Sequence, residues 1–193
     1  MRQYGGPILL AILLAAGCTE APEPSLPMNL TIPLEIVDWE ELQGWIADQQ
    51  GKVVVIDVWS TFCLTCIEEF PHFVSLHENY GNQIACASLN INFYGGPGNH
   101  PVDARAQVLE FLAAKKATMQ NFISSDPDEI VLQHLDAGSI PIALVYDPSG
   151  KLHTIFTNDD DQYGPTGFSY KQQITPLVDQ LLRTTQRSPT SSQ

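Results

Sequence analysis

The stretch from Lys52 to Trp59, KVVVIDVW, is apolar at almost every position. A strand with one solvated face would carry polar residues at alternate positions, so a run without alternation predicts a central strand covered on both faces. Such a strand needs helices on both sides of its sheet, which indicates the α/β class. The one acidic residue in the run, Asp57, is therefore expected inside the protein.

Strands and helices alternate along the rest of the chain. Apolar runs predict further strands at residues 34–37, 83–91, 141–146 and 151–157. Apolar stripes with helical spacing predict helices at residues 39–50, 63–80, 102–116, 127–135 and 171–183. Asp38 and Glu41 form a capping-box pattern, and the Asp-Pro-Ser-Gly turn at 147–150 suits an antiparallel hairpin. We expect a central mixed β-sheet flanked by helices on both faces.

The beginning of the chain has the pattern of an export signal. Arg2 precedes an apolar run from Pro7 to Ala16 that is too short to span a bilayer. The following LLAAGC resembles a bacterial lipobox, which implies a lipoprotein signal peptide at residues 1–17 and a lipid anchor on Cys18. Ordinary secretion with cleavage near Cys18 is the alternative. Both readings predict an extracytoplasmic protein on the periplasmic side of a bacterial membrane.

The remaining segments divide by composition. Residues 18–33 are Pro-rich and lack periodicity, so they are expected to form an extended tether. Residues 34–183 form the predicted folded domain, and the polar residues 184–193 are predicted to be a flexible tail. The net charge of −13 argues against binding to nucleic acid.

Two cysteines follow the central strand directly. Cys63 lies where the strand gives way to a helix, so free backbone N–H groups and the helix dipole favour its thiolate. A thiolate is a nucleophile, and Cys66, one turn further along, is placed to resolve a mixed disulfide formed on Cys63. The pattern therefore predicts a reactive dithiol.

The motifs around these cysteines resemble the thioredoxin superfamily, and most closely its TlpA- and ResA-type extracytoplasmic thiol-disulfide oxidoreductases. DVWSTFCLTCIEEFP is similar to the strand, active-site turn and helix of that family, and GSIPIALVYDPSGKL to its cis-proline strand and hairpin. The resemblance implies a thioredoxin-like fold, a redox-active Cys63–Cys66 disulfide and a cis Pro141. It also implies that Ile140 offers backbone hydrogen bonds to an extended substrate. Phe62 stands where the family usually has Trp, as an apolar shoulder for that substrate.

Two carboxylates are candidates for proton transfer. Burial of Asp57 in the central strand would raise its pKa toward the range of a useful base. Glu69 lies three residues after Cys66, on the same face of the helix, and coincides with the acid of the family's EFP signature. The sequence leaves open which of the two serves Cys66.

By resemblance, the protein is a membrane-anchored enzyme that reduces protein disulfides outside the cytoplasm. Its expected partners are disulfide-containing protein substrates and a membrane electron donor, with no cofactor and no metal. The alternative is a non-catalytic binding protein on the same fold, either a copper chaperone or a partner-binding module.

Other uses of the cysteine pair fit the sequence less well. A structural disulfide would close a very small loop and contribute little stability. Zinc ligands Cys63, Cys66, His72 and His77 would all lie on one helix and would not converge from two elements. Covalent haem attachment requires His directly after the second cysteine, where Ile67 stands.

The copper alternative would need a distant histidine, for which His100, His134 or His153 would have to serve. We expect these histidines on surfaces or loops. Cys86, inside an apolar strand, is expected to behave as a small buried hydrophobe. Residues 159–161, three consecutive aspartates, are expected to form a solvated acidic loop.

Overall fold

The structure is a computed structural model that describes Met1 and residues 31–187. Apart from Met1, the predicted signal peptide lies outside the described residues, as do Cys18, most of the predicted tether and residues 188–193. Within the described part of the chain, every helix is too short or too polar to cross a membrane.

A six-stranded sheet forms the centre of the domain, in the order β1-β4-β3-β2-β5-β6. Neighbours among β1, β4, β3 and β2 are parallel, whereas β5 and β6 run antiparallel to their neighbours. The predicted mixed sheet is thereby confirmed. The strands are β1 (Glu35–Val37), β2 (Val53–Trp59), β3 (Ile84–Asn90), β4 (Gln120–Ser124), β5 (Ile142–Tyr146) and β6 (Leu152–Phe156).

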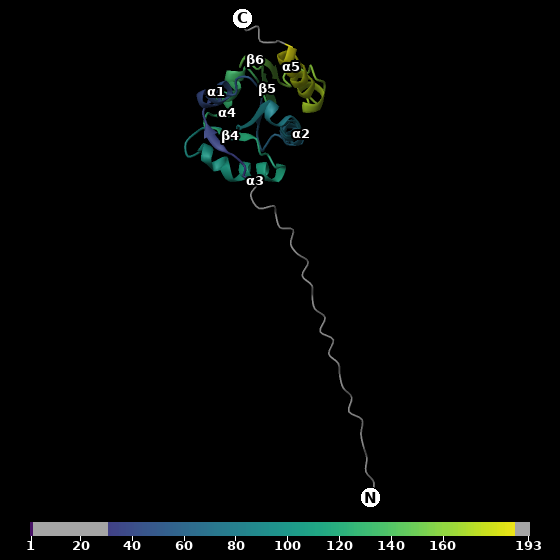
Figure 1. The fold of residues 1–193 in the computed structure, drawn as a ribbon. Helices are drawn as coiled ribbons and strands as arrows, with labels where there is room; N and C mark the ends of the chain where they lie inside the picture. Colours follow the sequence, from purple (N-terminus) through teal and green to yellow (C-terminus); the bar gives the residue numbers. More distant parts are fainter. Residues whose placement is uncertain (2–30, 188–193) are drawn as a thin grey trace.

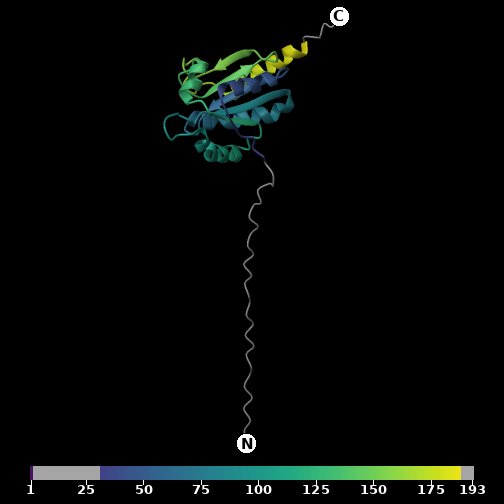
Figure 2. The ribbon, with the colours of Figure 1, turned by 90° about the vertical axis from the view of Figure 1, so that its left-hand side faces the viewer.

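Helices cover both faces of the sheet (Figures 1 and 2). The helices are α1 (Trp39–Asp48), α2 (Leu64–Tyr80), α3 (Arg105–Lys115), α4 (Asp128–Leu135) and α5 (Thr175–Arg187). Three short turns of helix accompany them: η1 (Gly81–Gln83), η2 (Pro101–Ala104) and the π-helical η3 (Tyr170–Ile174). Side chains of α2, α3 and α5 form the core on one face, and side chains of α1 and α4 form the core on the other.

The fully buried strand β2 separates these two cores, as the apolar run predicted. Val53 and Val55 face α2 and α5, whereas Val54 and Ile56 face α1 and α4. Complete burial of such a side chain contributes about 1.5–3 kcal/mol, so β2 anchors both layers. Asp57 lies two residues after Val55 on the same strand, so its side chain also points to the face covered by α2.

The structure agrees with the predicted start of α1 and differs from the predicted end of the last helix. The capping box at α1 is present, with the Asp38 carboxylate accepting the Glu41 N–H at 2.8 Å and the Glu41 carboxylate accepting the Asp38 N–H at 2.9 Å. At the other end of the chain, α5 continues to Arg187. The residues from 184 to 187, predicted to belong to the flexible tail, are therefore helical.

One strand was not recognised as such in the sequence. No strand was predicted between the helices expected at 102–116 and 127–135, yet β4 lies there and is inserted in parallel between β1 and β3. Polar residues at its start, Gln120 and Asn121, hide the pattern. Asn121 is satisfied inside the protein because its amide donates to the carbonyls of Ala117 and Met119 and accepts the Ser88 hydroxyl.

Candidate active site

The two cysteines form a disulfide at the start of α2. Cys63 is the N-cap residue, and its sulfur accepts the backbone N–H of Cys66 at 3.2 Å. Cys66, in the first turn, is only 2% exposed, whereas Cys63 is half-buried. A second thiol can therefore approach the Cys63 sulfur more readily than the Cys66 sulfur.

The surroundings of Cys63 favour a negative charge on its sulfur once the disulfide is reduced. The sulfur lies at the positive end of the α2 dipole, and the first turn of α2 contains no acidic residue to oppose it. The Thr65 hydroxyl is 3.4 Å from the same sulfur and can donate to a thiolate. These contacts stabilise the nucleophilic form of Cys63.

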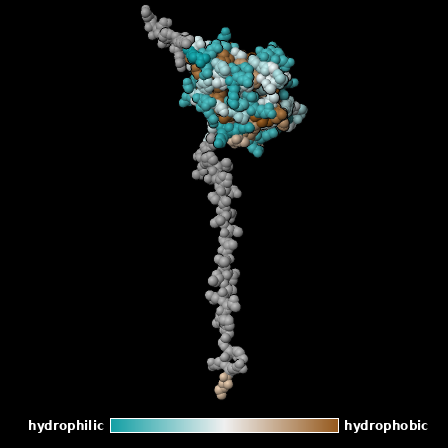
Figure 3. Space-filling model, turned by 90° about the vertical axis from the view of Figure 1, so that its right-hand side faces the viewer, coloured by the Kyte–Doolittle hydropathy of each residue, from teal (hydrophilic) through white to brown (hydrophobic). Residues whose placement is uncertain are grey.

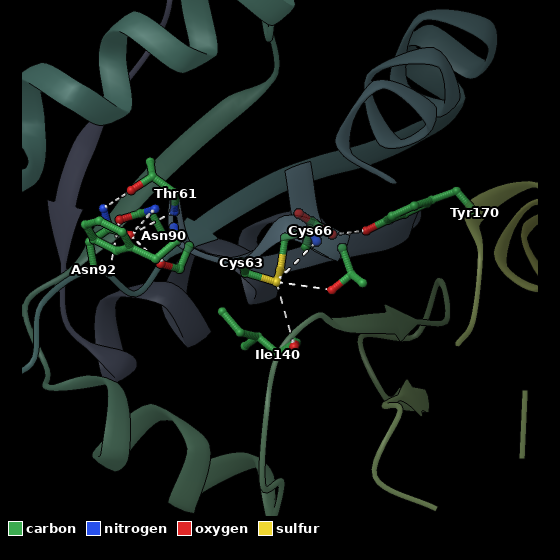
Figure 4. The surroundings of a disulfide bond; sticks show 11 residues. Thr61, Cys63, Cys66, Asn90, Asn92, Ile140 and Tyr170 are labelled. Atoms are coloured by element: carbon green, nitrogen blue, oxygen red, sulfur yellow. Dashed lines mark hydrogen bonds between the residues drawn. A yellow bond between two sulfur atoms is a disulfide. The ribbon is translucent and has the colours of Figure 1, made fainter. Parts of the chain in front are cut away.

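The segment before β5 passes close to the disulfide (Figure 4). The Ile140–Pro141 peptide bond is cis, and the Ile140 carbonyl oxygen lies 3.8 Å from the Cys63 sulfur. Asp159 holds this segment, since its carboxylate accepts the Gly138 N–H and the Ser139 hydroxyl, both at 2.9 Å. The sequence grouped Asp159 with a solvated acidic loop and missed this contact.

A buried polar cluster fixes the turn that leads into Cys63. The Asn92 side-chain oxygen accepts the Ser60 hydroxyl at 2.8 Å and the Thr61 N–H at 3.0 Å, and its amide donates to the Thr61 hydroxyl at 2.6 Å. Asn90 adds a bond from its own amide to the same oxygen. The cluster lies on the opposite side of the disulfide from Tyr170 in Figure 4. Its residues lie at or just after the ends of β2 and β3, so they meet only when those strands pair.

Asp57 is 3% exposed, and one of its oxygens accepts the Tyr170 hydroxyl. The other oxygen, Oδ2, is buried without a hydrogen-bond partner. Burial raises the pKa of Asp57 from 3.8 to about 7; the Tyr170 hydrogen bond acts in the opposite direction, and the Glu69 charge adds to the increase. Asp57 lies on the same face of the sheet as Cys66, which belongs to the core under α2.

Glu69 is also linked to Tyr170. Its carboxylate accepts the Tyr170 backbone N–H at 3.1 Å and lies 3.4 Å from the His72 ring nitrogen. Tyr170 thus contacts both candidate acids, one through its hydroxyl and the other through its backbone. Sequence reasoning missed Tyr170 because it lies 113 residues from Asp57 and belongs to no recognisable motif.

The residues considered above as zinc or copper ligands do not form a cluster. Within residues 31–187, no three His, Cys, Asp or Glu side chains are grouped so that they could hold a metal ion. His134 stacks on Trp39 with ring centroids 4.9 Å apart, and the His153 ring is hydrogen-bonded to Thr154. His100 precedes η2, and its backbone N–H donates to the Asp103 carboxylate at 2.8 Å.

The chain is similar in sequence to proteins named thiol-disulfide oxidoreductases. No family model matches the chain. The thiol-disulfide oxidoreductase ResA of Bacillus subtilis is 25% identical over 114 residues, which cover 58% of this chain and 56% of that protein. ResA of Geobacillus thermodenitrificans is 25% identical over 157 residues, which cover 78% of this chain and 83% of the relative.

Solved structures agree on the fold. A secreted disulfide oxidoreductase of Mycobacterium tuberculosis superposes with a TM-score of 0.52 at 17% identity, covering 70% of this chain and 86% of that one. A DsbF homologue of Corynebacterium diphtheriae gives 0.54 at 17% identity, covering 70% of this chain and 76% of the other. The fold is thioredoxin-like, and the chain is similar in sequence to proteins named thiol-disulfide oxidoreductases. Both of these sequence relatives are named ResA.

Proposed function

We propose that this protein is a membrane-anchored reductase of protein disulfides outside the cytoplasm. The observation that carries the proposal is the asymmetry of the cysteine pair. Cys63 is accessible and capped by a backbone N–H, whereas Cys66 is buried one turn behind it. A client can reach the first sulfur, and only the second sulfur can then reach the mixed disulfide.

In the reducing direction, the Cys63 thiolate attacks one sulfur of the client disulfide, and the other client sulfur leaves as a thiolate. The Cys66 thiol then loses its proton and attacks the Cys63 sulfur, which expels the second client thiolate and forms the Cys63–Cys66 disulfide. Two electrons pass to the client, which gains two protons from its surroundings. A dithiol electron donor at the membrane restores the reduced pair.

The nearby residues have distinct parts in this cycle. Asp57 accepts the proton of Cys66 through its unpartnered oxygen, a role supported by its pKa near 7. Glu69 is the second candidate for that transfer. Ile140 and the cis Pro141 present an extended client segment to Cys63, and the exposed Phe62 packs against it.

The location rests on the chain's first residues. The signal-like residues 1–17 and the lipobox-like Cys18 support export and lipid anchoring. Residues 18–33 then serve as a tether for the domain at residues 34–183, and residues 184–193 follow it. Mass spectrometry of the protein purified from a bacterial membrane fraction tests this arrangement: it should find a mature chain that begins with a lipid-modified Cys18.

Insulin reduction tests the activity. The full chain should accelerate insulin reduction by dithiothreitol, Cys63→Ser should abolish that acceleration, and Cys66→Ser should accumulate mixed disulfides. Cys86→Ser, in the buried third cysteine, is the matched control and should retain activity. The absence of Cys63-dependent turnover would favour the alternative, a non-catalytic binding protein. A dithiol potential well above the cytosolic glutathione poise would contradict the reducing direction.

A further inference from the structure

A groove of about 270 Å³ opens beside Cys63. Most of its wall is apolar, and the apolar residues that line it are Phe62, Ile91, Tyr94, Leu132 and Ile140. The wall combines the turn before Cys63, the loop after β3 and the helix α4. These elements meet on the face of the sheet covered by α1 and α4, since Ile91 and Leu132 belong to that core.

Two aromatic side chains at this groove are exposed to solvent. Phe62 is 67% exposed and Tyr94 is 53% exposed, and their ring centroids lie 6.4 Å apart. Leu64, beside Cys63, is exposed as well. By contrast, the surface shown in Figure 3 is mainly hydrophilic, with apolar residues in separate patches. Exposed aromatics gathered next to a reactive sulfur favour contact with an apolar side chain of a client.

The groove has one charged wall residue, Asp128. Its carboxylate accepts the Glu129 N–H at 2.9 Å, and the residue lies in the first turn of α4. Within residues 31–187, the lysines and arginines form no ion pair with it. The net charge of −13 attracts cationic clients from a distance, and Asp128 offers them an unpaired partner beside Cys63.

We propose that this groove selects client segments that carry an apolar residue and a lysine or arginine beside the target cysteine. The apolar side chain packs against the exposed rings of Phe62 and Tyr94, and the basic side chain pairs with Asp128. The inference rests on the proposed reductase activity, for which it names the substrate class.

Three disulfide-cyclised peptides of equal length test this selectivity with the full-length protein. One has Phe next to each cysteine and Lys beyond it, the second has Glu in place of Lys, and the third has Ser in place of Phe. At low ionic strength we expect kcat/KM for the Phe-Lys peptide to exceed that for the Phe-Glu peptide by about tenfold. The difference should shrink at 0.5 M salt, because salt screens exposed charges.

Two variants assign the preference to the groove. Asp128→Asn keeps the bond to the Glu129 N–H and should reduce the Lys-over-Glu preference to about twofold. Glu129→Gln, an exposed neighbour that does not line the groove, is the matched control and should keep it. Tyr94→Ser should reduce the preference for Phe over Ser, with the preference for Lys retained.

Binding of the same peptides, with the disulfide replaced by a thioether, separates this inference from the activity. If no peptide is reduced but the thioether form of the Phe-Lys peptide binds in an Asp128-dependent manner, the groove is supported and the reductase function is not. Equal reduction of the Lys and Glu peptides by a Cys63-dependent reaction would overturn the selectivity and leave the reductase function standing. Unchanged preference in Asp128→Asn would also overturn it.

Discussion

The Tyr170 hydroxyl should control the pH at which Asp57 loses its proton. Tyr170 is buried, and its ring packs on Phe73 with centroids 5.2 Å apart. Tyr170→Phe keeps this packing and removes only the hydroxyl that donates to Asp57. Because that hydrogen bond stabilises the ionised carboxylate, its loss should raise the pKa of Asp57 above the present value of about 7.

The size of the effect follows from the strength of such a bond. A hydrogen bond to a charged group contributes about 1.5–3 kcal/mol, and one pKa unit corresponds to about 1.4 kcal/mol. The variant should therefore raise the pKa of Asp57 by about one to two units.

The pH dependence of the free energy of unfolding reports the pKa of Asp57, because proton binding is linked to folding. Because folding raises the pKa of Asp57 from 3.8 to about 7, the folded state holds the proton more tightly than the unfolded state. The free energy of unfolding should then fall by about 4 kcal/mol as the pH rises from about 4 to above 7, as far as Asp57 alone contributes. In Tyr170→Phe the decline should continue to a pH about one to two units higher.

Urea unfolding of the oxidised protein at closely spaced pH values from 4 to 9 measures this directly. Asp57→Asn should remove the Asp57-dependent decline, which identifies the group that titrates. Tyr163→Phe removes a hydroxyl that is not hydrogen-bonded to Asp57, so this variant should have the same profile as the wild type. The decline that remains in Asp57→Asn is subtracted from the other profiles. If the profiles of Tyr170→Phe and the wild type then coincide, the hydroxyl does not set the pKa of Asp57 and the reasoning is wrong.

Three further predictions concern the supports of the site. Asn92→Ala should lower the free energy of unfolding by about 1–3 kcal/mol and reduce kcat, measured by urea unfolding and insulin reduction, because buried partners lose their hydrogen bonds. Asp159→Ala should raise KM for peptide disulfides more than it lowers kcat, since it releases the segment before Pro141, whereas Asp160→Ala should change neither. Cys86 should resist alkylation of the native protein by iodoacetamide at pH 8, because burial raises its thiol pKa far above the ordinary value; rapid labelling before unfolding would contradict this.

The central strand and the start of α2 could be predicted because each is encoded in a short, continuous stretch. The apolar run at 52–59 specifies a strand buried on both faces, and the cysteine spacing specifies which residues share the first turn of the next helix. Strand β4 escaped recognition because a polar residue inside the protein, Asn121, breaks its apolar pattern. Inside the protein, the Asn121 side-chain oxygen accepts the hydroxyl of Ser88 in the neighbouring strand, and no local sequence pattern indicates this contact.

The parts of the site that were missed are all contacts between distant segments. Asn92 supports the Cys63 turn from the loop after β3, and Tyr170 reaches Asp57 from the start of η3. Asp159 supports the segment before Pro141 from the loop after β6. Each partner has an ordinary residue type outside any recognisable motif, so the interaction appears only once the folded sheet brings these segments together.

The proton-transfer side and the client side of this site lie on different faces of the sheet. Tyr170 belongs to the core under α2 and α5, whereas Ile91 and Leu132, which line the groove, belong to the core under α1 and α4. Substitutions without shared contacts usually act additively. The double variant Tyr170→Phe/Asp128→Asn should therefore combine the shifted pH profile of the first change with the weakened lysine preference of the second. Non-additive kinetics for the Phe-Lys peptide would show that client binding and proton transfer communicate through the sheet.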